Sequence, residues 1–284
     1  MAASEEFSVA DTDALLELIY SSPSGRIIIV GGQAVNFWAD RYAPDEPKLL
    51  EHRPFTSRDL DLLATIANAY RLASETRGAL EKPRRRAASP VLANVEVKTG
   101  GTIRSVQFLK SVRGVKNREI PSNAVEFVIG DTKISVADPI TMFQAKLHNI
   151  IELDQRGRND RKHVEILKFC VPIFLKRQLA AAKESEAAAR DCLRTMQRIL
   201  ELSRSSIGER FGRFDWKALI PIERLHRARN PRLRNFREQQ FERWLKSVQR
   251  RRFIGFHDRA TQVASFAHFQ ILNAAPSRVW SVRK

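Results

Sequence analysis

The stretch Arg26-Ile-Ile-Ile-Val-Gly-Gly-Gln-Ala-Val35 decides the fold, because an apolar run ends abruptly in Gly31 and Gly32. The β-branched residues before the glycines favour a short buried strand over residues 26–30. Apolar side chains then recur at helical spacing over residues 33–42. The pattern therefore predicts a strand that turns directly into a helix, along a backbone path that favours glycine.

A pair of aspartates, Asp59 and Asp61, lies further along, in the apolar stretch 59–64. Side chains alternate along a strand, so a strand here would place both carboxylates on one face. Two carboxylates near exposed backbone amides suit a divalent metal that carries a nucleotide phosphate. The alternative is an ordinary turn followed by an exposed strand face, and each motif alone is a weak signal.

The chain is strongly basic, with 49 Lys and Arg against 32 Asp and Glu and a net charge of +17. Such an excess attracts polyanions, so we expect contact with nucleic acid; the alternative is simple solubility. No apolar run is long enough to span a bilayer, and the N-terminus lacks the pattern of a signal peptide. We therefore expect a cytoplasmic protein without membrane contact, in which Cys170 and Cys192 are buried free thiols.

The first half of the chain alternates strand and helix patterns, whereas the second half has helical patterns only. Strands are expected at 26–30, 59–64, 91–98, 102–109, 124–129 and 133–136, and helices at 11–20, 33–42, 66–79, 140–153, 161–179, 180–202, 216–248 and 261–272. Pro172 should kink or split its helix, and Pro221 and Pro231 should break theirs. The predicted fold is an α/β (α+β) core over 1–138, followed by an all-helical, basic C-terminal domain over 139–284.

Three stretches together resemble the nucleotidyltransferase superfamily, and within it the bacterial AbiEii/MenT toxin-like group. The resemblance covers roughly residues 26–165 and implies a nucleotidyltransferase-like mixed sheet. It also implies a Mg²⁺-dependent (or Mn²⁺-dependent) transfer of a nucleoside monophosphate from a nucleoside triphosphate to a hydroxyl group of RNA. Within the group this RNA is tRNA, and a cognate antitoxin is the expected protein partner. The stretches are Val30-GGQAVNFWADRY-Ala43, Pro54-FTSRDLDLL-Ala64 and Asp138-PITMFQAKLH-Asn149.

This resemblance assigns roles to individual residues. Asp59 and Asp61 would hold the metal, and Lys146 would bind the phosphates and stabilise developing charge. For Lys146 the alternative is a surface lysine whose stem covers apolar neighbours. The basic cluster of the group corresponds to Arg158, Arg161 and Lys162. The nucleotide-binding residues would be Gly31, Gly32, Ser57, Lys146, Arg158 and Lys162.

Two departures from the group pattern bear on catalysis. A third carboxylate is expected on a later strand, where this chain has Gln107, which brings no charge and cannot act as a base. Glu96 and Glu126 lie on neighbouring strand patterns and are candidate substitutes. The second departure is His163, which stands where the group has an aspartate. The alternative is therefore that the protein has a degenerate nucleotidyltransferase fold and binds nucleotide or RNA without catalysis.

A third hypothesis is a nucleotidyltransferase that acts on a small cationic acceptor of the aminoglycoside kind. The positive net charge of the chain disfavours it, because the protein and the acceptor would repel each other.

The C-terminal region supplies much of the charge, with eleven Lys and Arg against three Glu over residues 222–252. We expect its arginines to contact RNA phosphates, together with a basic loop near residue 85. Phe236, Phe241 and Trp244 either stack on bases or pack on the core, and packing is the expected outcome. The RNA-binding candidates are Arg84, Arg85, Arg86, Arg232, Arg234, Arg237 and Arg243.

Overall fold

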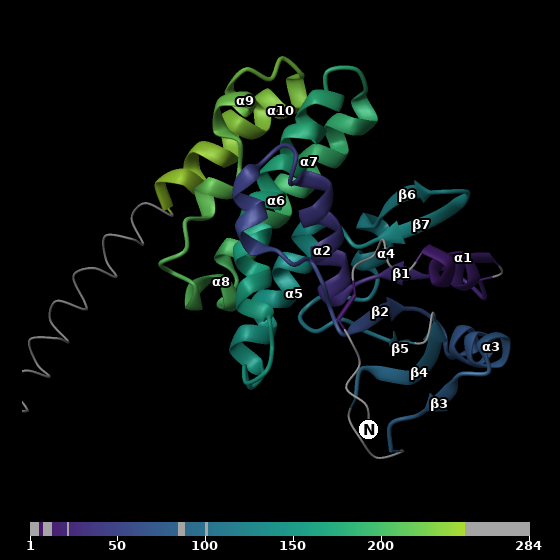
Figure 1. Ribbon diagram of the computed structural model, residues 1–284. Coiled ribbons are helices and arrows are strands. Elements are labelled where there is room, and N and C mark those ends of the chain that lie inside the picture. The colour runs from purple at the N-terminus through teal and green to yellow at the C-terminus, as the bar shows by residue number, and fades with distance from the viewer. Residues whose placement is uncertain (1–5, 8–12, 22, 85–88, 100–101, 248–284) are drawn as a thin grey trace, which may run out of the picture.

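A seven-stranded mixed sheet forms the first half of the protein (Figure 1). The computed structural model describes residues 6–7, 13–21, 23–84, 89–99 and 102–247. The strands are β1 (Ile28–Ile29), β2 (Asp59–Leu63), β3 (Ala79–Glu81), β4 (Val91–Thr99), β5 (Thr102–Leu109), β6 (Val125–Ile129) and β7 (Thr132–Val136). Their order is β3-β4-β5-β2-β1-β7-β6; β2 runs parallel to β5 and β1 to β7, and the other neighbours are antiparallel. The predicted α+β class is therefore confirmed; only the short β3 was not predicted.

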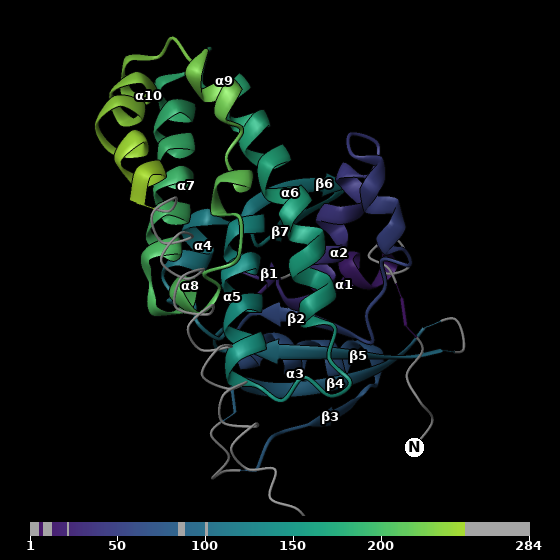
Figure 2. The same ribbon diagram turned by 90° about the vertical axis from the view of Figure 1, so that its left-hand side faces the viewer.

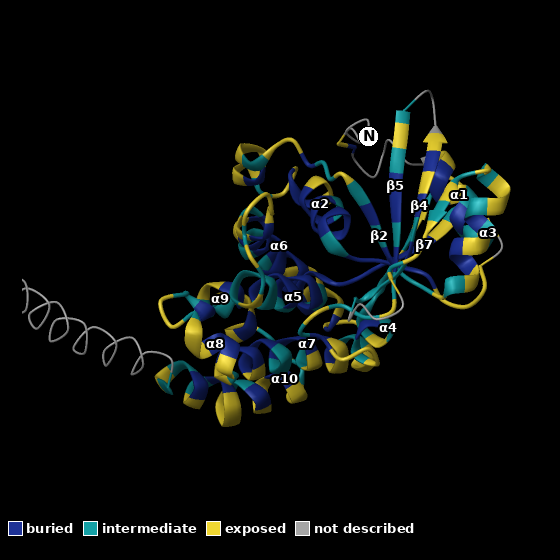
Figure 3. Cartoon of the chain, turned by 90° about the horizontal axis from the view of Figure 1, so that it is seen from below, coloured by how far each residue is buried: buried dark blue, intermediate teal, exposed yellow. Residues whose placement is uncertain are grey.

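Helices cover both faces of the sheet, and after β7 every described element is helical. Figure 3 shows α1 and α3 on one side, and α2 with α5 and α6 on the other. The helices are α1 (Asp13–Ser21), α2 (Gly31–Tyr42), η2 (Pro47–His52), α3 (Ile66–Thr76), α4 (Glu119–Asn123), α5 (Pro139–Glu152), α6 (Asp160–Ala181), α7 (Glu186–Arg204), α8 (Ser206–Arg210), η3 (Trp216–Leu219), α9 (Ile222–His226), α10 (Pro231–Phe236) and η4 (Arg237–Phe241). None of these helices is both long and apolar enough to cross a membrane.

The central strands have one apolar and one polar face. On β2, Leu60 and Leu62 are fully buried, and their partners across the ladder, Val106 and Phe108 on β5, are buried as well. Because side chains alternate, the residues between them lie on the opposite face, towards α2. Burial of the apolar row thus fixes the register and leaves a row of polar side chains on the other side.

The proline in the predicted helix 161–179 does not divide it. Helix α6 runs from Asp160 to Ala181 with Pro172 inside, so of the two predicted outcomes the split is wrong and the kink stays a prediction. The helix tolerates the lost hydrogen bond because its apolar residues, among them the thiol of Cys170, are buried in the core.

The other proline breaks are confirmed. Pro221 caps α9, and Pro231 opens α10. Cys170 and Cys192 are buried free thiols, as expected. The predicted helix over 261–272 lies outside the described residues.

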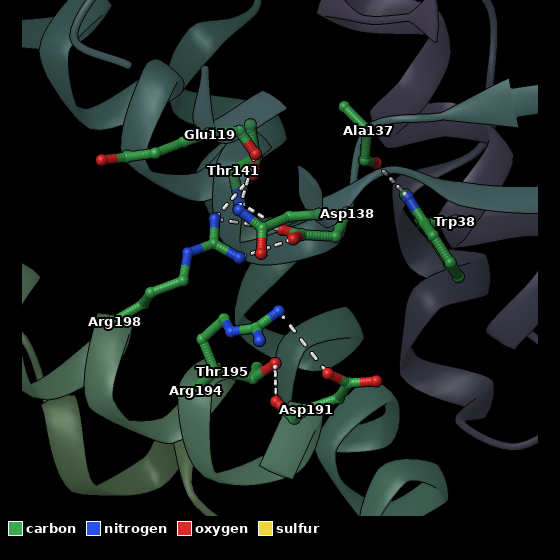
Figure 4. A network of polar contacts seen from close by, with 10 residues as sticks. Trp38, Glu119, Ala137, Asp138, Thr141, Asp191, Arg194, Thr195 and Arg198 are labelled. Atoms are coloured by element: carbon green, nitrogen blue, oxygen red, sulfur yellow. Dashed lines mark hydrogen bonds and ion pairs between the residues drawn. The ribbon is translucent and has the colours of Figure 1, made fainter. Parts of the chain in front are cut away.

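A buried polar network lies at the junction between the sheet and the helices (Figure 4). Asp138 caps α5 by accepting a 2.6 Å hydrogen bond from the amide of Thr141, and it forms a 2.6 Å ion pair with Arg198 of α7. The Trp38 indole of α2 donates to the carbonyl of Ala137, at 2.8 Å. All described strands precede this junction, as predicted; the division into two domains stays a prediction.

Candidate functional site

The turn at Gly31 brings helix α2 onto the aspartate pair. Gly31 has a φ of +68°, and a Cβ added there would lie 1.8 Å from Oδ2 of Asp61. Just before it, the amide of Val30 donates a 2.9 Å hydrogen bond to the carbonyl of Asp61. Both the backbone conformation and the space around it therefore require glycine.

The second glycine touches two other candidate residues. A Cβ on Gly32 would lie 2.9 Å from Oγ of Ser57 and 3.3 Å from Cε1 of His163. The structure thus brings together the first turn of α2, the segment before β2 and the first turn of α6. Ser57 is itself held in place, because its amide and carbonyl both pair with Phe7, each at 3.0 Å.

The ladder between β2 and β5 settles which residue stands beside the aspartates. Asp61 pairs with Gln107 and Asp59 with Ser105, so Gln107 is the direct neighbour of Asp61 on the same face. Glu96 of β4 pairs with Ser105, which places it two strands, about 10 Å, from Asp59.

Neither candidate substitute therefore stands beside the pair. Glu126 lies on the edge strand β6 at one end of the sheet and forms a 2.7 Å ion pair with Lys133. Within the described part of the chain, no group of three or more His, Cys, Asp or Glu side chains is arranged to hold a metal.

Lys146 is buried rather than at the surface, so the surface-lysine alternative is wrong. Its ammonium forms a 2.9 Å ion pair with Oδ1 of Asp160, and both side chains are less than a tenth exposed. Arg158 donates to the other oxygen of the carboxylate at 2.7 Å, and Asn149 donates to Oδ1 at 3.1 Å. These contacts lower the pKa of Asp160 to about 2, against the opposing effect of burial.

The charges of Lys146 and Arg158 also act on the aspartate pair. Burial is the main cause that raises the pKa of Asp61, and the charge of Asp59 acts in the same direction; Lys146, the Gly32 amide and Arg158 oppose them, and the net pKa is about 6. The raised pKa means that the negative charge of Asp61 is unfavourable in this half-buried place, and a bound cation would offset that cost.

The donor set fits one divalent metal ion. Asp59 and Asp61 share one face, are half-buried and supply two carboxylates, while the amide of Gln107 offers a neutral carbonyl oxygen at the adjacent position. The Asp61 carboxylate itself occupies the place that a side chain on Gly31 would fill, so the absence of a side chain there lets the carboxylate approach the start of α2.

Asp160 and its contact with Lys146 were not predicted. The two residues are 14 positions apart and lie on different helices. In the sequence, the only sign of a partner for Lys146 is that Asp160 is an acidic residue in an Arg-rich segment. Near this cluster, Arg161 is exposed and Lys162 donates to the carbonyl of Pro54 at 3.2 Å.

The basic C-terminal candidates lie away from the aspartates. In Figures 1 and 2, α9 and α10 lie at one end of the helical layer and the loop before α6 at the other. The 22 residues of α6 span about 33 Å, which sets the scale of this separation.

Several of these arginines already have protein partners. Arg232 pairs with Glu186 at 2.9 Å, and Arg237 donates to the carbonyl of His226 at 2.7 Å. Arg234 and Arg243 are exposed, as is Arg84, while Arg85 and Arg86 lie outside the described residues.

The aromatic residues of the same region belong to the core. Phe236, Phe241 and Trp244 are 2% exposed or less, and the Trp244 indole donates a 2.7 Å hydrogen bond to Ser203. Their expected packing is confirmed, and the stacking alternative is wrong.

The chain matches no family model and no curated protein. A solved structure, an antigenic nucleotidyltransferase-like protein from Paracoccidioides brasiliensis, matches 58% of this chain and 78% of its own, with a TM-score of 0.37 and 12% identity. A similarity of this size carries no functional inference.

Proposed function

We propose that the protein is a Mg²⁺-dependent nucleotidyltransferase that moves a nucleoside monophosphate from a triphosphate to a hydroxyl. The observation that carries this proposal is the contact between the Gly31 turn and Asp61, beside a buried lysine cluster. A helix N-terminus, two carboxylates on one face and adjacent cations are together suited to a metal-bound triphosphate.

In this mechanism each group of the chain has one task. The first-turn amides of α2 and the cations Arg158 and Lys162 would bind the triphosphate, and Asp59 and Asp61 would hold the ion. Lys146 stabilises charge on the transferred phosphoryl group. The bound Mg²⁺ supplies charge neutralisation at the phosphoryl group and the leaving pyrophosphate.

We propose RNA, and by resemblance tRNA, as the acceptor, in a toxin-like role with an antitoxin partner. The net charge of +17 supports a polyanionic partner. An acceptor that contacts both α10 and the aspartates must span the length of α6, about 33 Å, which suits a folded RNA better than a small molecule.

Labelled nucleotide should be incorporated into total RNA by the wild-type protein with Mg²⁺ and at least one of the four ribonucleoside triphosphates. The Asp61→Asn variant should lose about 100-fold or more of this activity, because the metal loses a charged ligand. If no triphosphate labels RNA while an active nucleotidyltransferase does so in parallel, the transferase proposal fails.

The alternative proposal is a protein that binds nucleotide without transferring it, and Gln107 beside Asp61 supports it. Replacing Gln107 with Asp would restore a third carboxylate next to the pair. A large gain of transfer in Gln107→Asp identifies the natural protein as a binder or a weakened enzyme. Full wild-type activity that Gln107→Asp does not raise excludes this alternative.

The Arg232→Ala, Arg234→Ala, Arg237→Ala triple variant tests the RNA surface. RNA binding should weaken, and the slope of log K against log salt should fall by up to about 2, at about 0.7 for each lost phosphate contact. Nucleotide binding should not change.

A matched control removes the exposed cations Lys110, Lys116 and Arg118 of the sheet half. Equal RNA affinity and an equal salt slope in the two triple variants would exclude α10 as the RNA surface.

A further inference from the structure

His163 is a buried side chain with one ring nitrogen, Nδ1, that has no hydrogen-bond partner in the described part of the chain. Only 6% of the residue is exposed, and its Nδ1 is enclosed with no partner among the described residues. Its Cε1, the carbon between the two ring nitrogens, lies against Gly32 in the first turn of α2. Buried polar atoms are nearly always paired, so an unpaired one at a candidate ligand site points to a ligand.

The ring is neutral in the folded protein. Burial lowers the pKa of His163 to about 3, and the nearby charge of Lys146 acts in the same direction against the opposing effect of Asp160. A neutral imidazole has one N–H donor and one acceptor. In either tautomer, Nδ1 has no partner in the described residues and is left to pair with a ligand, as an acceptor or as a donor.

Ser57 and His163 both lie against Gly32. A Cβ on Gly32 would approach Ser57 Oγ at 2.9 Å and His163 Cε1 at 3.3 Å. The Ser57 backbone is fixed by its pair of hydrogen bonds with Phe7, which holds this residue beside the first turn of α2. Beside Gly32 the site therefore offers two neutral hydrogen-bonding groups, whereas its cations lie around Asp160.

We propose that His163 and Ser57 bind the ribose hydroxyls of the nucleotide and make the site selective for ribonucleotides over deoxyribonucleotides. This inference rests on the proposed nucleotide site. Phosphates are best bound by the metal, amides and cations, whereas a vicinal diol pairs with neutral donors and acceptors. A sugar that lacks one hydroxyl leaves a buried polar group of the protein unpaired, which is the basis of strong rejection.

The test compares binding of the four ribonucleoside triphosphates with their 2′-deoxy and 3′-deoxy analogues, and with inorganic tripolyphosphate, in Mg²⁺ by calorimetry. Wild type should bind at least one ribonucleotide about tenfold or more tighter than a deoxy analogue. His163→Phe should reduce this ratio to about threefold or less, with tripolyphosphate affinity unchanged. His163→Gln, which keeps a neutral donor, should retain part of the ratio.

His226→Phe is the control, because this histidine is about half exposed and its contact is with Glu242. If His163→Phe does not fold, Ser57→Ala tests the same ratio at a half-buried position.

Equal binding of ribo and deoxy forms by wild type would overturn the inference while leaving the nucleotide site intact. An unchanged ratio in both His163→Gln and Ser57→Ala would also overturn it. Failure of wild type to bind any triphosphate or tripolyphosphate would instead contradict the proposed function itself.

Discussion

Replacing Gly31 with alanine is expected to destabilise the protein by about 3 kcal/mol or more, and to abolish metal-dependent nucleotide binding. The backbone at this position has a φ of +68°, which costs an alanine about 1–2 kcal/mol. The added Cβ would also lie 1.8 Å from Oδ2 of Asp61, so either the helix start or the carboxylate must move. Urea unfolding midpoints measure the first effect, and nucleotide titration measures the second.

Gly157 offers a matched control for this substitution. Its φ is also +68°, but nothing lies within 4 Å of the place that a Cβ would occupy. Gly157→Ala should therefore show only the conformational cost, about 1–2 kcal/mol. Equal losses in the two variants would mean that the contact with Asp61 contributes nothing.

Replacing Asp160 with asparagine is expected to cost about 3–5 kcal/mol, because the buried ammonium of Lys146 loses its counter-charge. The acid stability profile should change as well. The pKa of Asp160 is about 2 in the folded protein, against 3.8 for an ordinary aspartate side chain. Its contribution of about 2 kcal/mol is therefore present above pH 4 and is lost as the pH falls through about 2.

In the Asp160→Asn variant this part of the acid dependence should be absent. Asp154→Asn is the control, because Asp154 is exposed and pairs with the exposed Arg156. It should leave the urea midpoint almost unchanged. If the Asp160→Asn variant is as stable as wild type, the buried charge of Lys146 does not need this carboxylate as its partner.

Local patterns predicted the parts of the site that lie within single elements. The strand–turn–helix at Gly31 and the shared face of Asp59 and Asp61 depend on a few consecutive residues. Gln107 was singled out by the resemblance, as the residue at the place of a third carboxylate, and the ladder between β2 and β5 puts it beside Asp61. The roles of these residues remain predictions.

Contacts between distant elements were beyond these patterns. The approach of His163 to Gly32 depends on how α6 packs against α2, and the ion pair of Lys146 with Asp160 joins two helices across a loop. Helix α6 likewise continues through Pro172 because tertiary burial outweighs a local penalty. In each case the outcome depends on packing between distant elements, which a short stretch of sequence does not determine.

The network around Asp138 has a consequence for how the chain unfolds. Arg198 of α7 donates to both Asp138 and Thr141, at 2.6 Å each, so the helical layer is tied to the last strand through buried charges. Rotation about the chain between β7 and α5 would break these contacts and leave an unpaired buried carboxylate. The link therefore cannot serve as a hinge, and the sheet and helices should melt in one cooperative calorimetric transition.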